Sequence, residues 1–142
     1  METAIQKKNF DEIMACEIEP KMGTEKPVFL HDYPAVFGSL AQNKLDDPLI
    51  AERFELYIAG IELCNAFTEL RNPKEQRQRF EHEIQERRAM GKKEYPMPEK
   101  FLNALKHMPK AAGNALGIDR LTMLFADTTL IDDVVAFTPE NL

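Results

Sequence analysis

The sequence predicts an α+β fold, in which an antiparallel β-sheet is flanked by helices, and three observations support this prediction. Residues 52–70 alternate apolar and polar side chains on both sides of an Ala-Gly pair, which is typical of a β-hairpin. Apolar and charged residues recur with helical spacing over 73–91 and 98–108. Residues 111–125 then change from a glycine-spaced strand pattern to a helical pattern.

Length and composition indicate a single domain that spans residues 1–142. The chain is 44% hydrophobic, which is enough for a core of its own. Its net charge is -6 and its Lys and Arg residues are scattered, which argues against nucleic-acid binding by this chain alone. It has no apolar run long enough to cross a bilayer and no apolar signal segment at the start, and Cys16 and Cys64 lack metal or disulfide spacing. We therefore expect a cytoplasmic protein without a membrane partner.

The first part of the chain predicts one short helix and two extended segments. Asn9 can cap a helix with Glu12 reaching back to it, and Pro20 ends that helix. Residues 26–34 form an apolar stretch bounded by prolines, which predicts a strand. Residues 35–42 predict a second, shorter extended segment.

The hairpin pattern places two glutamates together. A two-residue loop at Ala59-Gly60 would put Tyr57 opposite Glu62, with Glu55 on the same polar face as Glu62. Two carboxylates on one face could share a hard cation such as Mg²⁺. On the residues alone, two solvent-facing glutamates beside Tyr57 are the favoured interpretation.

The alternation fails beyond Cys64, because Asn65 and Glu69 fall where apolar residues are expected. Either a β-bulge shifts the register there, or the two polar side chains point inward. A buried carboxylate is costly without a partner, so Glu69 should then meet a cation, either an internal Lys or Arg or a ligand ammonium.

Two helices and a strand complete the pattern outside the glycine-rich stretch. Pro73 opens the first helix and Gly91 closes it, with opposite charges spaced four residues apart. These charges indicate a solvated face, to which we assign no chemistry. The second helix should carry Phe101, Leu105 and Met108 on one side, and residues 134–137 predict a terminal buried strand.

The stretch "GNALGIDR" supplies glycines beside an arginine. Gly113 and Gly117 leave a backbone that a ligand can approach closely, and Arg120 is a planar cation suited to phosphates or to stacking on a base. The simpler interpretation, favoured on the residues alone, is a tight strand-to-helix turn. Asp119 would then lie near the helix start and Arg120 on the surface.

The stretches "ERFELYIAGIELCNAFTEL", "NPKEQRQRF" and "GNALGIDRLTMLF", in this order, resemble the C-terminal part of the class II lysyl-tRNA synthetase catalytic core. In this resemblance, which covers about residues 10–139, "GIDRL" is motif 3. That family typically has glycine where this chain has Ala115. The alanine, together with "EKPVFLHDYPAVFGSLAQ" and "GIELCNAF", is similar to the paralogous ligases that attach (R)-β-lysine to elongation factor P.

The resemblance implies a partial class II synthetase fold, the cofactors ATP and Mg²⁺, and the formation of an aminoacyl adenylate. It implies that Arg120 and Glu62 are catalytic, that Arg120, Glu55, Glu62 and Gly117 bind ATP, and that Glu55 and Glu62 hold Mg²⁺. It further implies that Asn65 orients the substrate carboxylate, that Glu69 pairs with the substrate ammonium, and that Gly113 and Ala115 shape the amino-acid pocket. The implied partners are lysine or (R)-β-lysine and elongation factor P.

Two other interpretations stay open. The chain could belong to a true lysyl-tRNA synthetase acting on tRNA(Lys), or to a non-catalytic paralogue that binds only a ligand or a partner. No segment before residue 10 resembles class II motifs 1 or 2, so we expect the isolated chain to have little or no adenylation activity. We also expect self-association through the apolar surface that such missing strands would cover.

Overall fold

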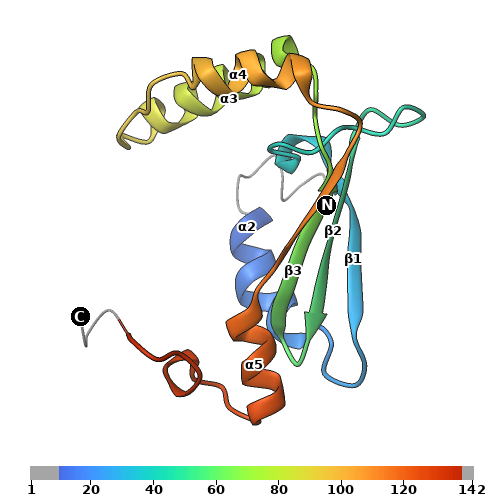
Figure 1. Cartoon of the computed structure of the whole chain (residues 1–142), viewed down its shortest axis with the longest axis vertical. Coiled ribbons are helices and arrows are strands. Elements are labelled where there is room, and N and C mark those ends of the chain that lie inside the picture. Colours follow the sequence, from blue (N-terminus) through green and yellow to red (C-terminus); the bar gives the residue numbers. More distant parts are fainter. Residues whose placement is uncertain (1–9, 139–142) are drawn as a thin grey trace. The chain divides into compact units, whose positions relative to one another are not determined.

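The computed structural model describes residues 10–138 and has the predicted α+β architecture, a four-stranded antiparallel sheet with helices (Figure 1). The strands are β1 (Val28–Pro34), β2 (Ile50–Ile58), β3 (Ile61–Thr68) and β4 (Ala112–Leu116), and they pair in the order β1-β2-β3-β4. The helices are α2 (Phe10–Ile13), α3 (Pro73–Ala89), α4 (Glu99–Ala104) and α5 (Ile118–Ala126). Short π or 3-10 turns occur at Met14–Ile18, Glu19–Lys21, Ala35–Phe37, Leu105–His107 and Ile131–Asp133. The opening helix is confirmed, while its predicted cap, Asn9, lies outside the described residues.

The chain divides into two compact units, and every strand contributes residues to both. Unit 1 comprises Met1–His31, Phe54–Ala66 and Asn114–Leu142. Unit 2 comprises Asp32–Arg53 and Phe67–Gly113. Whether the chain folds as a single domain stays a prediction.

The hairpin turn of unit 1 has the predicted two residues. Ala59 and Gly60 both have positive φ, 51° and 75°, as a tight hairpin turn requires. Their backbone N–H groups donate to the carbonyls of Gly23 and Met22, each at 2.8 Å. A Cβ on Gly60 would lie 2.8 Å from the Pro20 carbonyl oxygen, so the opening segment packs directly against the turn.

The hairpin face that was expected to be polar and solvated is the buried one. Glu55 is 5% exposed and Tyr57 is 1% exposed, whereas Phe54 on the other face is 37% exposed. The opening segment packs against this part of β2: Glu19 is hydrogen-bonded to the Tyr57 side chain, and a Cβ on Gly23 would lie 2.4 Å from the Tyr57 carbonyl oxygen. The favoured interpretation of two solvent-facing glutamates is therefore wrong for Glu55.

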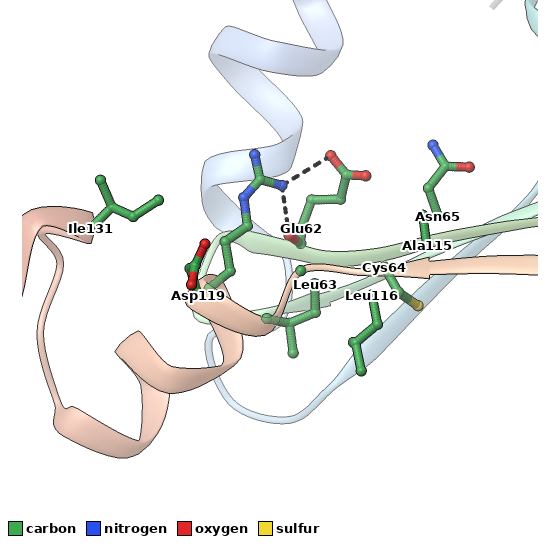
Figure 2. Close-up of a pocket in the computed structure, with 10 residues that line it drawn as sticks. Glu62, Leu63, Cys64, Asn65, Ala115, Leu116, Asp119 and Ile131 are labelled. Atoms are coloured by element: carbon green, nitrogen blue, oxygen red, sulfur yellow. Dashed lines mark hydrogen bonds and ion pairs between the residues drawn. The ribbon is translucent and has the colours of Figure 1, made fainter. Parts of the chain in front are cut away.

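A bulge resolves the break in alternation along β3. Leu63 and Cys64 are consecutive, yet their side chains point to the same side of the strand, while Glu62 and Asn65 point to the other (Figure 2). Asn65 consequently shares a face with Glu55 and donates from Nδ2 to Glu55 Oε1 at 2.8 Å. Of the two predicted explanations, the register shift is thus the one observed for Asn65.

The two long helical signals of unit 2 are confirmed. The Asn72 side chain caps α3 by accepting from the N–H groups of Lys74 and Glu75, and Gly91 follows the helix with a φ of 66°. The predicted Glu75–Arg79 ion pair is present at 2.7 Å. Helices α3 and α4 run side by side (Figure 1), and Leu102 and Leu105 supply the buried side chains of the second helical segment.

Two strand predictions are wrong. In the segment 35–42, Ala35–Phe37 form a 3-10 turn, and only Ala41, by bridging to Glu69, has strand character. The Gly38 and Ala41 N–H groups donate within the segment, to the carbonyls of Ala35 and Gly38, so they are not available to a neighbouring strand.

Residues 134–137 likewise form no strand. The Val134 N–H donates to the Ile131 carbonyl at 3.0 Å, which closes a turn, and Phe137 is 74% exposed. Exposed apolar side chains gather in this part of unit 1, namely Ile118, Phe125, Leu130, Ile131 and Phe137. The predicted self-association through such a surface stays a prediction. Within residues 10–138, no helix has the length and apolar character that crossing a membrane requires.

Candidate functional site

A pocket of about 340 Å³ opens in unit 1 where β3, the end of β4 and the start of α5 meet (Figure 2). Five of the predicted site residues line it: Glu62, Asn65, Ala115, Gly117 and Arg120. Leu63, Cys64, Leu116, Asp119 and Ile131 complete the lining, and none of these five was predicted as a site residue. Leu63 and Cys64 form the bulge in β3. The broken alternation was the only signal of this bulge in the sequence.

The glycine before α5 fixes the position of Arg120. Gly117 donates its N–H to the Leu63 carbonyl at 2.8 Å, which ties the end of β4 to β3. Helix α5 begins at the next residue, and Arg120 in its first turn donates a hydrogen bond to the carbonyl of Glu62 on β3. The strand-to-helix turn is therefore tight, as the simpler interpretation predicted, and it also directs a cation into the pocket.

Arg120 and Glu62 face each other across the pocket. Arg120 Nη1 donates to the Glu62 carbonyl at 2.8 Å and lies 3.4 Å from Glu62 Oε2. The Arg120 side chain is 49% exposed, and its Nε and Nη2 make no hydrogen bond within residues 10–138. One edge of the guanidinium is thus anchored, and the remaining donors are available to an anion.

Glu55 lies beneath the pocket rather than in its lining. Tyr57 donates its hydroxyl to Glu55 Oε2 at 2.8 Å, and Asn65 Nδ2 donates to Oε1 at the same distance. Both carboxylate oxygens therefore already accept a hydrogen bond inside the protein. Glu55 holds Asn65 in place at the pocket wall, a role that sequence reasoning missed because the bulge changes which residues share a face.

Glu19, in the opening segment, lies near the two glutamates Glu55 and Glu62. Burial raises the pKa of Glu19, a hydrogen bond from Tyr57 opposes this rise, and the nearby charges of Glu55 and Glu62 raise the pKa further. Tyr57 has one hydroxyl proton, so it can donate to only one of the two carboxylates at a time. No local sequence pattern could have indicated Glu19, because the contact joins segments about 40 residues apart in the chain.

The pocket fits a nucleotide phosphate better than it fits a metal ion held by protein alone. Arg120 offers free donors to phosphate oxygens, and Glu62 offers a carboxylate beside them. Mg²⁺ is commonly held by one or two carboxylates together with substrate phosphates. Glu62 fits that role, whereas Glu55 would first have to release Tyr57 or Asn65. Among residues 10–138, no three acidic, His or Cys side chains are placed to hold a metal ion.

The remaining two predicted site residues lie together in unit 2. Glu69 is half-buried, and its carboxylate lies against the α-carbon of Gly113, where a Cβ would be only 2.6 Å from Glu69 Oε1. No hydrogen bond or ion pair to this carboxylate occurs within the described part of the chain. The internal cation that a buried Glu69 would need is therefore not found there, and the side chain remains open to a ligand.

Comparison with known proteins shows the family to which this chain belongs. The family model described as class II tRNA synthetases (D, K and N) matches residues 1–141. The chain is 49% identical over 121 residues to the elongation factor P–(R)-β-lysine ligase of Proteus mirabilis, which covers 84% of this chain and 37% of that protein. It is 46% identical over 130 residues to the ligase of the same name from Edwardsiella ictaluri, covering 91% of this chain and 40% of that protein.

The chain therefore spans well under half the length of the relatives it matches. The family match, in contrast, extends over nearly the whole of this chain, and it includes the strand-to-helix segment that carries Gly117 and Arg120. Arg120, Glu62 and Asn65 line one pocket, and the roles that the resemblance implied for them stay predictions. This chain belongs to the class II tRNA synthetase family of the D, K and N group.

Proposed function

We propose that this chain carries the ATP-binding motif 3 half of a ligase that activates lysine or (R)-β-lysine and transfers it to a lysine of elongation factor P. The observation that carries the proposal is Arg120, which is anchored on Glu62 in one pocket and has two guanidinium nitrogens without a partner among residues 10–138. The relatives are named as ligases for (R)-β-lysine and elongation factor P, which favours that amino acid and that acceptor over tRNA(Lys). These substrates would place the protein in the cytoplasm.

In the proposed reaction, a carboxylate oxygen of the amino acid attacks the α-phosphorus of ATP. The new P–O bond gives an aminoacyl adenylate, and the bond to pyrophosphate breaks. The acceptor amine then attacks the acyl carbon, AMP leaves, and the amine loses a proton. Catalysis of the first step rests on positioning and on charge stabilisation.

This chain's residues would contribute to that step in distinct ways. Arg120 would stabilise the charge on the phosphate oxygens through its free donors. Asn65, held by Glu55, would orient the amino-acid carboxylate, and Glu69 would pair with its side-chain ammonium. Mg²⁺, when bound through Glu62 and the phosphates, would neutralise phosphate charge. Ala115 lines the same pocket, where one methyl can adjust discrimination between substrates by only ~1 to 3 kcal/mol.

The test is calorimetric titration of the 142-residue chain with Mg-ATP, comparing the wild type with Arg120→Ala and with Arg120→Lys. We expect Arg120→Ala to weaken ATP binding at least tenfold, and Arg120→Lys to recover only part of the loss, because lysine lacks the planar fork. Arg88→Ala removes another exposed arginine, in α3, and serves as the matched control.

Equal ATP affinity in the wild type and in Arg120→Ala would refute the role of Arg120. Absence of Mg-ATP binding by the wild type would refute nucleotide binding by this chain. Adding (R)-β-lysine or L-lysine to the titration then identifies the preferred amino acid. Tighter binding with L-lysine would argue for the lysyl-tRNA synthetase alternative.

A further inference from the structure

The backbone around Glu69 is held from both sides in unit 2. On one side, Gln42 donates its N–H to the Thr68 carbonyl at 2.7 Å, and the Leu70 N–H donates to the Leu40 carbonyl at 2.9 Å. On the other side, the Glu69 N–H donates to the Ala111 carbonyl at 3.0 Å. The main chain is therefore fixed, and only the side-chain torsions of Glu69 decide where its carboxylate lies.

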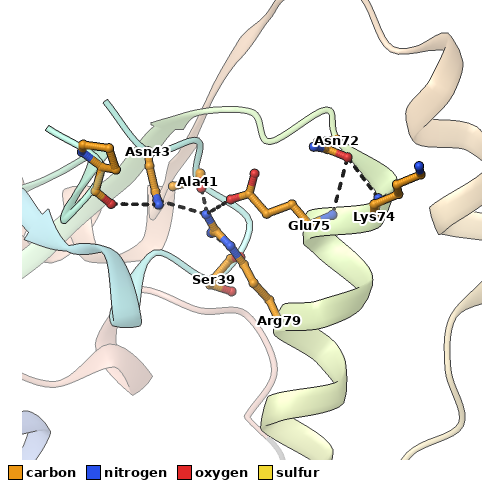
Figure 3. A network of polar contacts seen from close by, with 8 residues as sticks. Ser39, Ala41, Asn43, Asn72, Lys74, Glu75 and Arg79 are labelled. Atoms are coloured by element: carbon orange, nitrogen blue, oxygen red, sulfur yellow. Dashed lines mark hydrogen bonds and ion pairs between the residues drawn. The ribbon is translucent and has the colours of Figure 1, made fainter. Parts of the chain in front are cut away.

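The segment 39–43 that supplies one of these sides is itself fixed by Arg79 (Figure 3). Arg79 Nη1 donates to the carbonyls of Ser39 and Ala41 at 3.0 and 2.8 Å, and Nη2 donates to Asn43 Oδ1 at 2.9 Å. The same Nη2 pairs with Glu75 on α3 at 2.7 Å. This guanidinium thus ties the segment beside Glu69 to helix α3.

Gly113 leaves the space into which the Glu69 carboxylate turns. A Cβ built on Gly113 would come within 2.6 Å of Glu69 Oε1, a distance that real Cβ atoms do not adopt. The other nearest atom, the carboxyl carbon of the same side chain, would be 3.8 Å away, so the conflict is with Glu69 alone. Gly113 is not among the residues with positive φ, so its backbone conformation is open to alanine.

Space, rather than backbone conformation, is therefore what glycine provides at this position. Alanine would meet only the far end of a flexible side chain, which can rotate away at little cost to stability. The rotation would nevertheless move the carboxylate that is proposed to pair with the substrate ammonium. Structure and ligand binding should thus respond differently to this substitution.

We propose that Gly113 is a positioning residue for Glu69: the missing side chain sets the orientation in which the Glu69 carboxylate receives the substrate ammonium. This inference rests on the proposed function for the identity of the ammonium. The geometry itself, a carboxylate seated against a glycine between two fixed backbone segments, depends only on the contacts given above.

The experiment compares Gly113→Ala, Glu69→Gln and the double variant in the full 142-residue chain, titrated with (R)-β-lysine and with L-lysine in saturating Mg-ATP. Gly113→Ala should weaken amino-acid binding at least tenfold while leaving the thermal unfolding midpoint unchanged. In the Glu69→Gln background, the same substitution should cause little further loss, because its effect acts through that carboxylate. Ala112→Ser, at the exposed neighbouring position on β4, is the matched control.

A second readout needs no amino acid. The ¹³C chemical shift of the Glu69 side-chain carboxyl should change in Gly113→Ala and stay constant in Ala112→Ser. If the wild type binds neither amino acid, the proposed function fails, and the carboxyl shift alone decides the inference. An unchanged carboxyl shift, or equal losses from Gly113→Ala with and without Glu69, would overturn the positioning role.

Discussion

Acidic side chains have different electrostatic surroundings in the two compact units. In unit 1, Glu19 lies close enough to Glu55 and Glu62 for their charges to raise its pKa, and Arg120 pairs with Glu62. In unit 2, three acidic side chains on or between helices α3 and α4 pair with an arginine: Glu75 with Arg79, Glu94 with Arg88 and Glu99 with Arg77. Like charges gathered around a pocket are typical of binding sites, whereas opposite charges in pairs stabilise a scaffold.

The pKa directions follow this difference. Hydrogen bonds from Arg77 and Arg88 lower the pKa of Glu99 and of Glu94. Burial and neighbouring carboxylates raise the pKa of Glu19 despite the Tyr57 hydroxyl. Removing the Glu19 charge should therefore stabilise the fold near neutral pH, whereas removing the Glu99 charge should destabilise it.

The largest effect is expected in unit 2, at Arg79. Its side chain is 19% exposed and donates to two carbonyls, an amide oxygen and a carboxylate. Arg79→Met should lower the free energy of unfolding by about 2 to 3 kcal/mol, because it leaves partly buried acceptors unpaired. Urea unfolding followed by circular dichroism measures the change.

Arg77→Met is the matched control for Arg79, since it removes an arginine from the same helix whose side chain is 40% exposed and which, in the described part of the chain, pairs with Glu99 alone. Exposed ion pairs contribute little, so its loss should be clearly the smaller. Equal losses for the two variants would show that the contacts of Arg79 to the 39–43 segment do not stabilise the unit.

Sequence periodicity predicted α3 because its signals are local. The Asn72 cap, the Glu75–Arg79 pair and the terminal Gly91 all act within a few residues of one another. The wrong predictions concern a segment that closes a turn and a hairpin face that a distant segment covers. Residues 134–137 have strand composition but close a turn, and the hairpin face with Glu55 became buried because the opening segment covers it.

A second, intermediate effect is expected in unit 1, at Glu55. Glu55→Gln should lower the free energy of unfolding by about 1 to 2 kcal/mol, because one of the donors from Tyr57 and Asn65 would face an amide NH₂. Glu62→Gln, on the same face but with a side chain 32% exposed, should change it little. Equal changes in urea unfolding for the two variants would contradict the assignment of Glu55 as the buried support of Asn65.

Sequence reasoning named several residues that line the pocket, but it did not predict how they are arranged, and their roles stay predictions. The residues in motif-like stretches, such as Arg120 and Asn65, do line one pocket. Their relation to Glu55 depends on the bulge at Leu63 and Cys64, and that of Glu19 depends on a contact between distant segments. Broken alternation signals that a bulge exists, but it does not say which side chains will then meet.

The smallest expected effect is the pH dependence of the free energy of unfolding that Glu19 contributes. Because the pKa of Glu19 is raised in the fold, its contribution stabilises the protein in acid and is lost as the pH rises through that raised pKa. Glu19→Gln should therefore be more stable than the wild type near neutral pH, by roughly a few tenths of a kcal/mol because the group is largely solvent-screened. The advantage should shrink toward about pH 4, where Glu19 is protonated in the wild type.

Glu99→Gln should behave with the opposite sign. The pKa of Glu99 is lowered by Arg77, so its contribution is present above the ordinary glutamate pKa and is lost as the pH falls. This variant should be less stable than the wild type near neutral pH, with a deficit that also shrinks in acid. Urea midpoints measured across this pH range test both variants together. Stability changes of the same sign near neutral pH would show that the acidic group of unit 1 is compensated in the same way as the pairs of unit 2.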